Sequence, residues 1–511
     1  IDAALSGKNT IVTTATASGK SLCFNIPALV DPLGAGRDST THARALYLYP
    51  TKALAQDQLR ALRKLMFSAE TAAVLDGDTP HSKRPGIVRG ASVVLTNPDM
   101  LHVSILPRHK DHAALLSSLK FVVIDEAHMY VGAFGAHVAL VIRRLRRLCA
   151  VYGSTPLFLA CSATLAEPAS HISQLTGIDP AAFEVPPETL QLNPESKAPA
   201  CWALNVVSKD GSPCGAKTFV LWNPPLKPAF LQNRPKGNSA KVAQLFAELV
   251  RHGLRTIAFC TTRKLSELVL QYCQEALQAS GHHHLVDTVM SYRGGYSSEQ
   301  RRNVEARLFG NDLRGAAATN ALELGVDVGS IDATLHLGFQ RSIASLFQQA
   351  GRAGRRQERS LSIYVAWDSP IDQYFLKNPE KLFTLPSEGT RLDLLNQDLM
   401  VPHLLCAANE EPLNPDSADR QIPDPFFSLR QNGHESLGSL LPLGSSGHLT
   451  FCGEAHPARD VSLRCLDEHR WRIQVDIGGI MTTLEEVEEW NAFYQIYEGA
   501  TYMNNGRTSQ P

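Results

Sequence analysis

The chain has 511 residues, of which 44% are hydrophobic and 19% are charged, and its formal net charge is −1. This length exceeds what one hydrophobic core usually supports, so we expect two or three domains. A net charge near zero excludes binding of a polyanion through an overall positive field, and any nucleic acid must be held by local basic and amide-lined surfaces.

The cysteines and the apolar stretches narrow the class of protein further. Ten cysteines are scattered without a C-x-x-C pair, and several, such as Cys161 and Cys260, lie in apolar runs. We interpret them as buried free thiols and predict no zinc within residues 1–511. Neither a signal peptide nor an apolar stretch of 18 or more residues is present, which favours a reducing interior compartment and no membrane partner. Because the chain starts at Ile1 rather than Met, we treat it as a fragment.

Residues 1–185 alternate short apolar runs with helical stretches. This rhythm predicts an α/β domain whose parallel sheet is covered on both faces. A Pro-rich segment, residues 186–235, follows as an inter-domain linker with an expected strand pair around Asp210-Gly211. The strands of the first block are predicted at residues 10–12, 45–49, 93–95, 121–124 and 157–161.

A second block of the same kind spans residues 236–385, so the predicted fold class is α/β with two tandem parallel-sheet domains. Residues 386–511 are expected to form a smaller, incomplete mixed α+β C-terminal region, with a strand at 471–477 and an acidic helix through 484–489. The strands of the second block are predicted at residues 256–260, 316–319, 333–337 and 361–366.

Residues 14–21, Thr-Ala-Thr-Ala-Ser-Gly-Lys-Ser, lie between a predicted strand and a predicted helix. Backbone N–H groups and a helix amino terminus bind phosphate oxygens in such a place, where Lys20 would reach the β and γ phosphates and Ser21 would ligate Mg²⁺. The strict pattern has Gly at the position of Thr14, so an ordinary loop-to-helix turn is the alternative. The predicted nucleotide contacts are Thr16, Ala17, Ser18, Gly19, Lys20, Ser21 and Leu22.

Asp125 and Glu126 follow the apolar run 121–124 directly. Two acids at the end of a fully apolar strand are costly to desolvate without a metal or strong donors. Asp125 is therefore predicted to bind Mg²⁺ together with Ser21, and Glu126 to act as the general base on the attacking water. An acid pair at a helix amino terminus is the structural alternative. With the phosphate loop, the pair predicts hydrolysis of a nucleoside triphosphate.

Transfer of a phosphoryl group also needs positive charge on the γ-phosphate. Residues 348–355, Gln-Gln-Ala-Gly-Arg-Ala-Gly-Arg, offer Arg352 and Arg355, which share one face if the segment is helical. An ordinary basic turn is the alternative. We expect a cleft between the two α/β blocks to close around the nucleotide and bring these arginines to it.

In their order along the chain these motifs resemble those of the superfamily-two DEAD/DEAH-box helicases. The matching stretches are residues 14–21 (motif I), 50–58 (Ia), 96–99 (Ib), 125–128 (II), 162–164 (III), 319–327 (V) and 348–355 (VI). The likeness is closest to helicases of the YprA/MrfA type, whose eukaryotic members are compared with RecQ-like helicase four. The stretches that carry this finer likeness are residues 16–23, 134–138, 342–346 and 402–406.

The resemblance implies two RecA-like domains with ATP and Mg²⁺ between them, and an ATP-hydrolysing 3′-to-5′ DNA translocase of genome maintenance, particularly of crosslink repair. Its location would be the nucleus in a eukaryote and the cytoplasm otherwise. The adenine-recognising element and the four-cysteine zinc module of the family are not visible here. The motif positions imply catalysis by Lys20, Glu126, Gln348, Arg352 and Arg355, nucleotide contacts by Gly325 and Asp327, and coupling by His128, Ser162 and Thr164.

Polar residues at matching strand ends of the two blocks are predicted to hold single-stranded or tailed duplex DNA by its phosphates. Capping or turn formation is the alternative for each Thr or Asn taken alone, whereas the ordered set favours backbone binding. The set is Thr51, Lys52, Gln56, Thr96 and Asn97 in the first block and Thr261, Thr262, Arg263 and Thr319 in the second.

Three further patterns are given structural interpretations. Residues 143–147, Arg-Arg-Leu-Arg-Arg, spread around a helix, so we favour a solvated helix face over a nucleic-acid patch. The His run 282–284 is interpreted as a polar turn rather than a metal site. Phe339 and Trp367 are interpreted as core aromatics rather than base-stacking groups.

Two other functions stay open at this point. An RNA-dependent ATPase would use the same motor, and a nucleic-acid clamp would bind ATP without productive hydrolysis. The intact Lys20, Glu126 and Arg355 argue against the clamp, because a degenerate motor usually loses one of them. Protein partners and oligomeric state are not predicted.

Overall fold

The structure is a computed structural model that divides into two compact units. The first comprises Ile1–Thr14, Gly19–Asp210 and Gly389–Arg464, and the second comprises Ala15–Ser18, Gly211–Glu388 and Cys465–Pro511. The described residues are 1–14, 18–34, 44–65, 71–163, 165–178, 204–212, 215–225, 238–296, 298–323, 329–354, 358–386, 388–413, 425–427, 440–442, 448–453, 456–464, 470–477, 480–489, 492–493, 496, 502–504 and 507–509.

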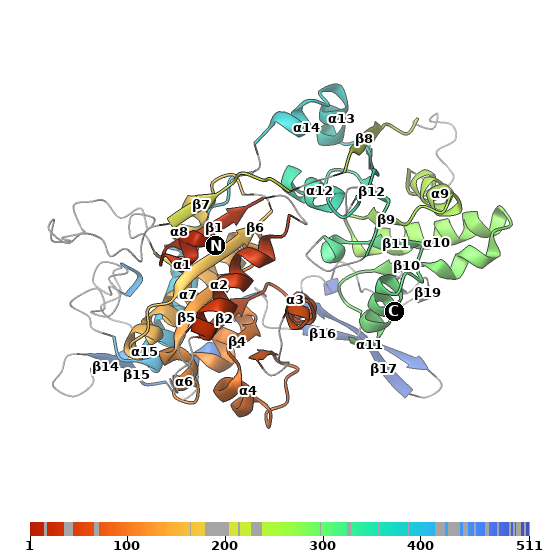
Figure 1. Cartoon of the computed structure of the whole chain (residues 1–511). Coiled ribbons are helices and arrows are strands. Elements are labelled where there is room, and N and C mark those ends of the chain that lie inside the picture. The colour runs from red at the N-terminus through yellow and green to blue at the C-terminus, as the bar shows by residue number, and fades with distance from the viewer. Residues whose placement is uncertain are drawn as a thin grey trace. The chain divides into compact units, whose positions relative to one another are not determined.

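A seven-stranded, all-parallel sheet in the order β3-β4-β2-β5-β6-β1-β7 forms the centre of the first unit (Figure 1). This confirms the predicted α/β class. Its strands are β1 (Asn9–Thr13), β2 (Arg44–Leu48), β3 (Ala72–Val74), β4 (Val93–Thr96), β5 (Leu119–Ile124), β6 (Leu157–Ser162) and β7 (Leu204–Val207). Its helices are α1 (Asp2–Leu5), α2 (Lys20–Gly34), α3 (Lys52–Leu65), α4 (Arg84–Gly90), α5 (Pro98–Met100), α6 (Ala113–Ser117), α7 (Gly132–Val151), α8 (Pro168–Thr176) and α15 (Gln397–Glu410).

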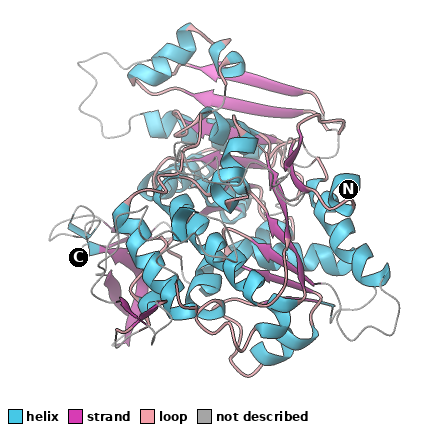
Figure 2. Cartoon of the chain, turned by 90° about the vertical axis from the view of Figure 1, so that its left-hand side faces the viewer, coloured by secondary structure: helices cyan, strands magenta, loops and turns pink. Residues whose placement is uncertain are grey.

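The central strands of this sheet are mostly apolar and buried because helices cover both of its faces. On β5, Val122 and Ile124 belong to the core cluster that includes α7 and α15, whereas Phe121 and Val123 belong to the cluster that includes α2 and α3. Figure 2 looks onto the side of the first unit that carries α15 in Figure 1 and shows helices in front of the strands. Burial on both sides leaves only the strand ends for polar chemistry.

The second unit is built around a six-stranded parallel sheet in the order β10-β11-β9-β12-β13-β8. One core cluster joins its strands to α9 and α10, and another joins them to α11. The strands are β8 (Lys217–Trp222), β9 (Thr256–Phe259), β10 (Val289–Tyr292), β11 (Gly315–Ala318), β12 (Ala333–Leu337) and β13 (Ser360–Val365). The helices are α9 (Asn238–Arg251), α10 (Arg263–Ala279), α11 (Ser298–Phe309), α12 (Ile343–Ala350), α13 (Pro370–Lys377) and α14 (Lys381–Thr384).

The strand pair expected around Asp210-Gly211 is wrong in its pairing. β7 pairs in parallel with β1, whereas β8 pairs in parallel with β13, so the two strands belong to different sheets. The outermost strand of a sheet carries a row of unpaired backbone groups. β7 pairs with these groups on β1, and β8 pairs with them on β13. Pairing β7 with β8 instead would leave both edges open.

The predicted C-terminal region, residues 386–511, is divided between the units: residues 389–464 lie in the first and residues 465–511 in the second. The domain boundaries themselves stay predictions. The strand expected at 471–477 is confirmed as β16 (Arg470–Ile477). The described residues of this region form three antiparallel pairs: β14 (Leu440–Pro442) with β15 (Leu449–Phe451), β16 with β17 (Ile480–Glu488), and β18 (Tyr502–Asn504) with β19 (Arg507–Ser509).

The acidic helix expected at residues 484–489 is wrong, because β17 is extended there and pairs with β16. Leu and Glu favour helices in isolation. The preceding strand, however, alternates Trp471, Ile473 and Val475 with polar residues and offers a complete set of backbone partners. Strand pairing overrides a weak local propensity.

Both interpretations of the Arg-Arg-Leu-Arg-Arg run are wrong, because Arg143, Arg144 and Arg147 are at most 3% exposed. On α7, Arg143 donates to the carbonyl of Gln174 at 2.9 Å, and Arg147 donates to the carbonyls of Ala407 and Glu411 at 3.0 and 2.8 Å. The last carbonyls of a helix lack partners within the helix, and cations near that end are favourable. The arginines therefore fasten the carboxyl ends of α8 and α15 to α7.

The other structural interpretations agree with the packing. The His run leads into the 3₁₀ turn η7 (His283–Thr288), which has no buried residue. Phe339 stacks on Phe375 with ring centroids 5.1 Å apart, and Trp367 packs against the core of the second unit. No helix among the described residues is long and apolar enough to cross a membrane.

The described cysteines are free, and most of them are buried. Burial raises the pKa of Cys149 to about 12 and that of Cys161 well above its usual value. Thiols with raised pKa values in apolar surroundings are unreactive. Cys201, Cys214 and Cys465 lie outside the described residues.

The buried pair between Arg144 and Glu410 generates a stability prediction. Nε of Arg144 lies 3.1 Å from Oε2 of Glu410, and a second nitrogen contacts Oε1, with both side chains at most 2% exposed. Arg144→Ala leaves an uncompensated buried carboxylate and is expected to lower the free energy of unfolding by ~3–5 kcal/mol. Urea unfolding followed by circular dichroism measures this loss.

Arg60→Ala is the matched control for that measurement. Arg60 pairs with Asp57 on the surface of α3 at 3.1 Å, and its side chain is 60% exposed. Its removal is expected to change stability by less than about 1 kcal/mol. Equal unfolding midpoints for the two variants would mean that the buried pair does not hold α15 to α7.

Candidate nucleotide and nucleic-acid site

The phosphate loop lies between the end of β1 and the first residue of α2, as predicted. Gly19 has φ +82°, a left-handed conformation that favours glycine, and it directly precedes the helix. Nζ of Lys20 donates to the carbonyl of Thr14 at 2.8 Å, so the ammonium group lies at the carboxyl end of β1. Ser21 and Leu22 follow in the first turn of α2, whereas Thr16 and Ala17 lie outside the described residues.

Lys20 shares its surroundings with the two predicted catalytic acids. Burial lowers the pKa of its ammonium group, and the charges of Glu126 and Asp125 oppose that shift. The loops meet because β1 and β5 both pair with β6, which places their carboxyl ends at one edge of the sheet. The structure therefore brings motifs I and II into a single site.

The acid pair has two different environments. Asp125 is 8% exposed, and its Oδ1 accepts a hydrogen bond from the backbone N–H of Glu126 at 2.9 Å. Burial, followed by the charge of Glu126, raises the pKa of Asp125 to about 7. Glu126 has φ +50° and ψ +48°, a left-handed conformation that costs a non-glycine residue about 1–3 kcal/mol. The chain thus turns sharply between the two carboxyl groups.

The predicted coupling residues His128 and Ser162 are in contact. Nδ1 of His128 lies 3.1 Å from Oγ of Ser162 and 3.6 Å from Oε2 of Glu126. Ser162 is fully buried at the end of β6. The imidazole therefore joins motif III to the proposed base, while Thr164 lies outside the described residues.

His171 also supports motif II, and sequence reasoning missed it. From α8 its Nε2 lies 3.0 Å from the carbonyl of Ala127, and its Nδ1 lies 3.0 Å from Oγ1 of Thr390. A single histidine in an ordinary helix carries no sequence signal. Only the packing of α8 and residue 390 against the turn after Glu126 gives this histidine a role.

The predicted nucleic-acid residues of the first unit gather at the carboxyl ends of β2 and β4, which are neighbours in the sheet. Several of these side chains have internal partners. Thr96 and Asn97 are at most 5% exposed, Oγ1 of Thr96 donates to the carbonyl of Leu75, and Oδ1 of Asn97 accepts from the N–H of Met100. Asn97 caps α5, the alternative weighed for it, and the contact of both residues with nucleic acid stays a prediction.

Three polar residues at this edge lie nearer the surface. Thr51 is half-buried and accepts from the N–H of Leu54 at 3.3 Å. Lys52 and Gln56 are exposed, with Nζ of Lys52 3.1 Å from Oδ1 of Asp78. Their contact with nucleic acid stays a prediction.

In the second unit, Thr261, Thr262 and Arg263 are exposed after β9. Thr262 caps α10 by accepting from the N–H of Leu265 at 3.1 Å. Thr319 follows the neighbouring strand β11 and is buried. The edge expected to hold nucleic acid is therefore formed, although each residue's contact stays a prediction.

Motif VI is only partly helical, because α12 ends at Ala350 and Arg352 lies in the turn beyond it. The shared face was expected only if the segment is helical, and because Arg355 lies outside the described residues, its placement relative to Arg352 stays a prediction. Gln348 and Arg352 are at most 4% exposed, and Arg352 donates to the backbone carbonyl of Glu323. Three of the implied site residues, Gly325, Asp327 and Arg355, lie outside the described residues.

A buried polar network holds motif VI to motif V. Nε2 of Gln349 donates to Oε2 of Glu323 at 2.9 Å, and Oε1 of Gln349 lies 3.1 Å from Nδ1 of His336. Burial lowers the pKa of His336 to about 4, so its imidazole is neutral at pH 7. The motif sequences contain Gln349 and Glu323, but only the fold shows that β12 supplies the histidine.

Comparison with known proteins gives the family. The model of the DEAD/DEAH box helicase family matches residues 1–172, and that of the helicase conserved C-terminal domain matches residues 240–357. A crystal structure of the DUF1998 helicase MrfA matches the whole chain at 33% identity and a TM-score of 0.66, with 68% of MrfA covered. This chain belongs to the DEAD/DEAH-box helicases of the YprA/MrfA type.

Other members of this helicase family are similar over nearly the whole chain. ATP-dependent helicase HRQ1 of Saccharomyces cerevisiae is 37% identical over 98% of this chain and 44% of its own length. YprA of Bacillus subtilis is 36% identical over 98% of this chain and 62% of its own length. MrfA bound to DNA and AMPPNP matches with a TM-score of 0.83 and 36% identity, covering 100% of this chain and 66% of MrfA. The chain thus spans about half the length of the yeast relative.

The helicase motifs Ia and Ib are bridged by a residue that sequence reasoning missed. Arg464 donates to both carboxylate oxygens of Asp99 at 2.8–3.0 Å and to the carbonyl of Pro50 at 2.6 Å. Its guanidinium group also lies over the ring of Phe134, 4.5 Å from the centroid. The arginine is 365 residues from Asp99 in sequence, so no local pattern indicates the contact.

The side chains at the nucleotide site fit Mg²⁺. Among the described residues, no group of three or more His, Cys, Asp and Glu side chains is arranged to hold a metal. Mg²⁺ needs no such group, since it is usually bound by one or two carboxylates, water and the phosphates of the substrate. Asp125 offers a buried carboxyl group whose charged form a cation would stabilise.

The raised pKa of Asp125 predicts a pH dependence. In the metal-free protein the carboxyl group is mostly protonated below about pH 7, and it must lose its proton to bind Mg²⁺. Mg²⁺-dependent binding of AMPPNP is therefore expected to strengthen as pH rises through 7, approaching about tenfold per pH unit on the acidic side. Isothermal titration calorimetry with and without Mg²⁺ measures the effect.

Asp125→Asn is the control, because the nucleotide's own titration is common to both proteins. The difference in pH dependence between the two proteins then reports the titration of Asp125 alone. The same pH dependence in Asp125→Asn and in the unmodified chain would contradict the assignment.

Proposed function

We propose that this chain is the ATP-hydrolysing motor of a DNA helicase. The observation that carries the proposal is the joint placement of Lys20, Asp125 and Glu126 at one sheet edge in a chain of the helicase family. DNA as the partner is supported by MrfA, a relative whose structure is bound to DNA and AMPPNP. In each unit, the carboxyl ends of neighbouring strands offer polar residues that can bind a nucleic-acid backbone.

Each residue has a chemical role in this proposal. Lys20 binds the terminal phosphates of ATP, and its partial burial strengthens that attraction. Glu126 takes a proton from the attacking water, and Asp125 binds Mg²⁺, which would polarise the γ-phosphate. The arginines of motif VI stabilise the charge that develops on the transferred phosphoryl group.

Hydrolysis of ATP is linked to movement along the DNA strand through His128 and Ser162, which lie beside the catalytic acids. His128 contacts both Glu126 and Ser162, so a change at the γ-phosphate alters a buried hydrogen bond between motifs II and III. The adjacent strand ends carry the nucleic-acid edge. Closure of the two units on ATP and their release after hydrolysis would advance the strand.

We further propose 3′-to-5′ movement and a role in DNA repair, with crosslinked DNA as one substrate. The resemblance to the YprA/MrfA type supports this finer assignment. A eukaryotic protein of this kind would act in the nucleus, and a bacterial one in the cytoplasm.

Two substitutions test the chemistry. Lys20→Ala is expected to abolish ATP binding and hydrolysis, since the phosphates lose their cation. Glu126→Gln is expected to lower turnover by about 10²–10⁴-fold while ATP still binds, because it removes only the base. Steady-state ATPase assays and nucleotide binding separate the two effects. Normal turnover by either variant would contradict the mechanism.

Lys120→Ala is the matched control for this pair. Lys120 is exposed and lies at the amino end of β5, the end opposite to Asp125. Its loss removes the same side chain and charge as Lys20→Ala does, from the far end of the strand that Asp125 follows, without touching the site. Its turnover is expected to equal that of the unmodified chain.

The nucleic-acid partner is tested by ATPase stimulation with single-stranded DNA and RNA of equal length and sequence. We expect DNA to stimulate more strongly, and displacement of duplexes with a 3′ tail but not with a 5′ tail. Stronger stimulation by RNA would favour the RNA-dependent ATPase. ATP binding without turnover on either nucleic acid would favour the clamp.

A further inference from the structure

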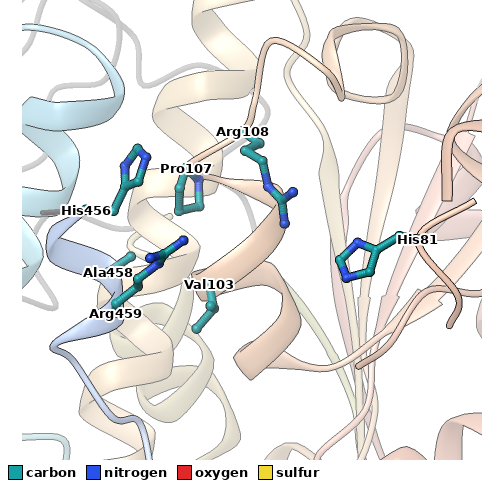
Figure 3. A pocket seen from close by; sticks show the side chains of 7 residues that line it. All are labelled: His81, Val103, Pro107, Arg108, His456, Ala458 and Arg459. Atoms are coloured by element: carbon teal, nitrogen blue, oxygen red, sulfur yellow. The ribbon is translucent and has the colours of Figure 1, made fainter. Parts of the chain in front are cut away.

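A pocket of about 280 Å³ opens on the first unit beside motif Ib (Figure 3). One wall is the stretch that follows η2 (Leu101–Ile105), a π-helical turn directly after α5. The other wall is η12 (Pro457–Arg459), near the end of the same unit. The lining residues are His81, Val103, Pro107, Arg108, His456, Ala458 and Arg459.

The polar lining of this pocket is entirely basic. It contains two arginines and two histidines and no acidic residue. In Figure 3, Arg108 lies between Arg459 on one side and His81 on the other. All four basic side chains are exposed. Guanidinium groups offer several N–H donors each, and an imidazole offers at least one.

Among the described residues, none of these basic groups has an acidic partner. Within the described part of the chain, the side chains of His81, His456 and Arg459 make no hydrogen bond or ion pair, and Arg108 bonds only to Oγ of Ser104, at 2.9 Å. By contrast, the exposed Arg251 pairs with Glu248. Uncompensated cations gathered in a concave surface attract an anion.

The two walls of the pocket are fixed to each other. Nε2 of His102, fully buried in η2, lies 3.1 Å from the carbonyl of Val461. Arg464, a few residues further on, holds Asp99 of motif Ib through both carboxylate oxygens. The pocket is therefore a preformed extension of the edge that carries motif Ib.

We propose that this pocket binds a backbone phosphate of the nucleic-acid strand, beyond the motif Ib contact. The inference rests on the proposed function and adds a site to it. Arginines bind phosphate oxygens through paired N–H donors, and such contacts position a strand without reading its bases. The four basic side chains around this pocket of about 280 Å³ offer several N–H donors to the oxygens of one phosphodiester unit.

The test is the salt dependence of DNA binding by the double variant Arg108→Gln/Arg459→Gln. Fluorescence anisotropy with labelled single-stranded DNA gives the association constant over a series of salt concentrations. Each lost phosphate contact is expected to reduce the slope of log K against log salt by about 0.7 and to weaken binding at low salt. ATP hydrolysis without DNA is expected to be unchanged, since neither arginine belongs to the nucleotide site.

The double variant Arg89→Gln/Arg251→Gln is the matched control. Both residues are exposed in the last turns of α4 and α9, which lead into the amino ends of β4 and β9, away from the predicted nucleic-acid edge. The control removes the same net charge. An equal slope and affinity for the two double variants would overturn the proposal.

Two further measurements separate other ligands. Binding of inorganic phosphate is followed by phosphorus-31 NMR. If the pocket variant loses phosphate binding while the salt slope of its DNA binding is unchanged, the site binds free phosphate and the strand assignment is overturned. Loss of poly-glutamate binding with an unchanged DNA slope would overturn it in favour of an acidic protein partner. Failure of the unmodified chain to bind DNA at all would instead refute the proposed function.

Discussion

The structure depends on charged groups placed at the carboxyl ends of strands that are mostly apolar and buried. The packing that buries β1, β5 and β6 also partly desolvates Lys20, Asp125 and Glu126. Burial lowers the pKa of Lys20 and raises the pKa of Asp125, and each shift favours the neutral form of the group. Such a set is stabilised by a phosphate and a cation, which supply the opposite charges. In the proposed function, nucleotide and Mg²⁺ would supply these opposite charges.

Further polar contacts tie the remaining parts of the first unit to this edge. The arginines of α7 bind carbonyls in the last turns of α8 and α15, and Arg464 holds Asp99 and Pro50. The described part of residues 389–464 therefore acts as a brace for motifs Ia and Ib within the first unit. The same segment forms one wall of the basic pocket, so the brace and the proposed strand contact share their anchoring.

Sequence patterns predicted those parts whose signal is local. The apolar runs and the alternation of strands with helices gave the two parallel sheets, and the order of the motifs gave the family. The errors have physical causes. Residues 484–489 have helix-forming side chains, but pairing with β16 keeps them extended. Arg143, Arg144 and Arg147 have charges typical of a surface, but helix ends packed against α7 offer them carbonyl partners.

The sequence by itself therefore determined the α/β class, the nucleotide chemistry of motifs I and II and the helicase family, because each depends on residues close together in the chain. Only the tertiary structure decided which side chains support them. His171, His336, Arg464 and the basic pocket depend on contacts between residues that are distant along the chain. A charged side chain has no fixed role until packing decides whether it meets water, a helix end or an opposite charge.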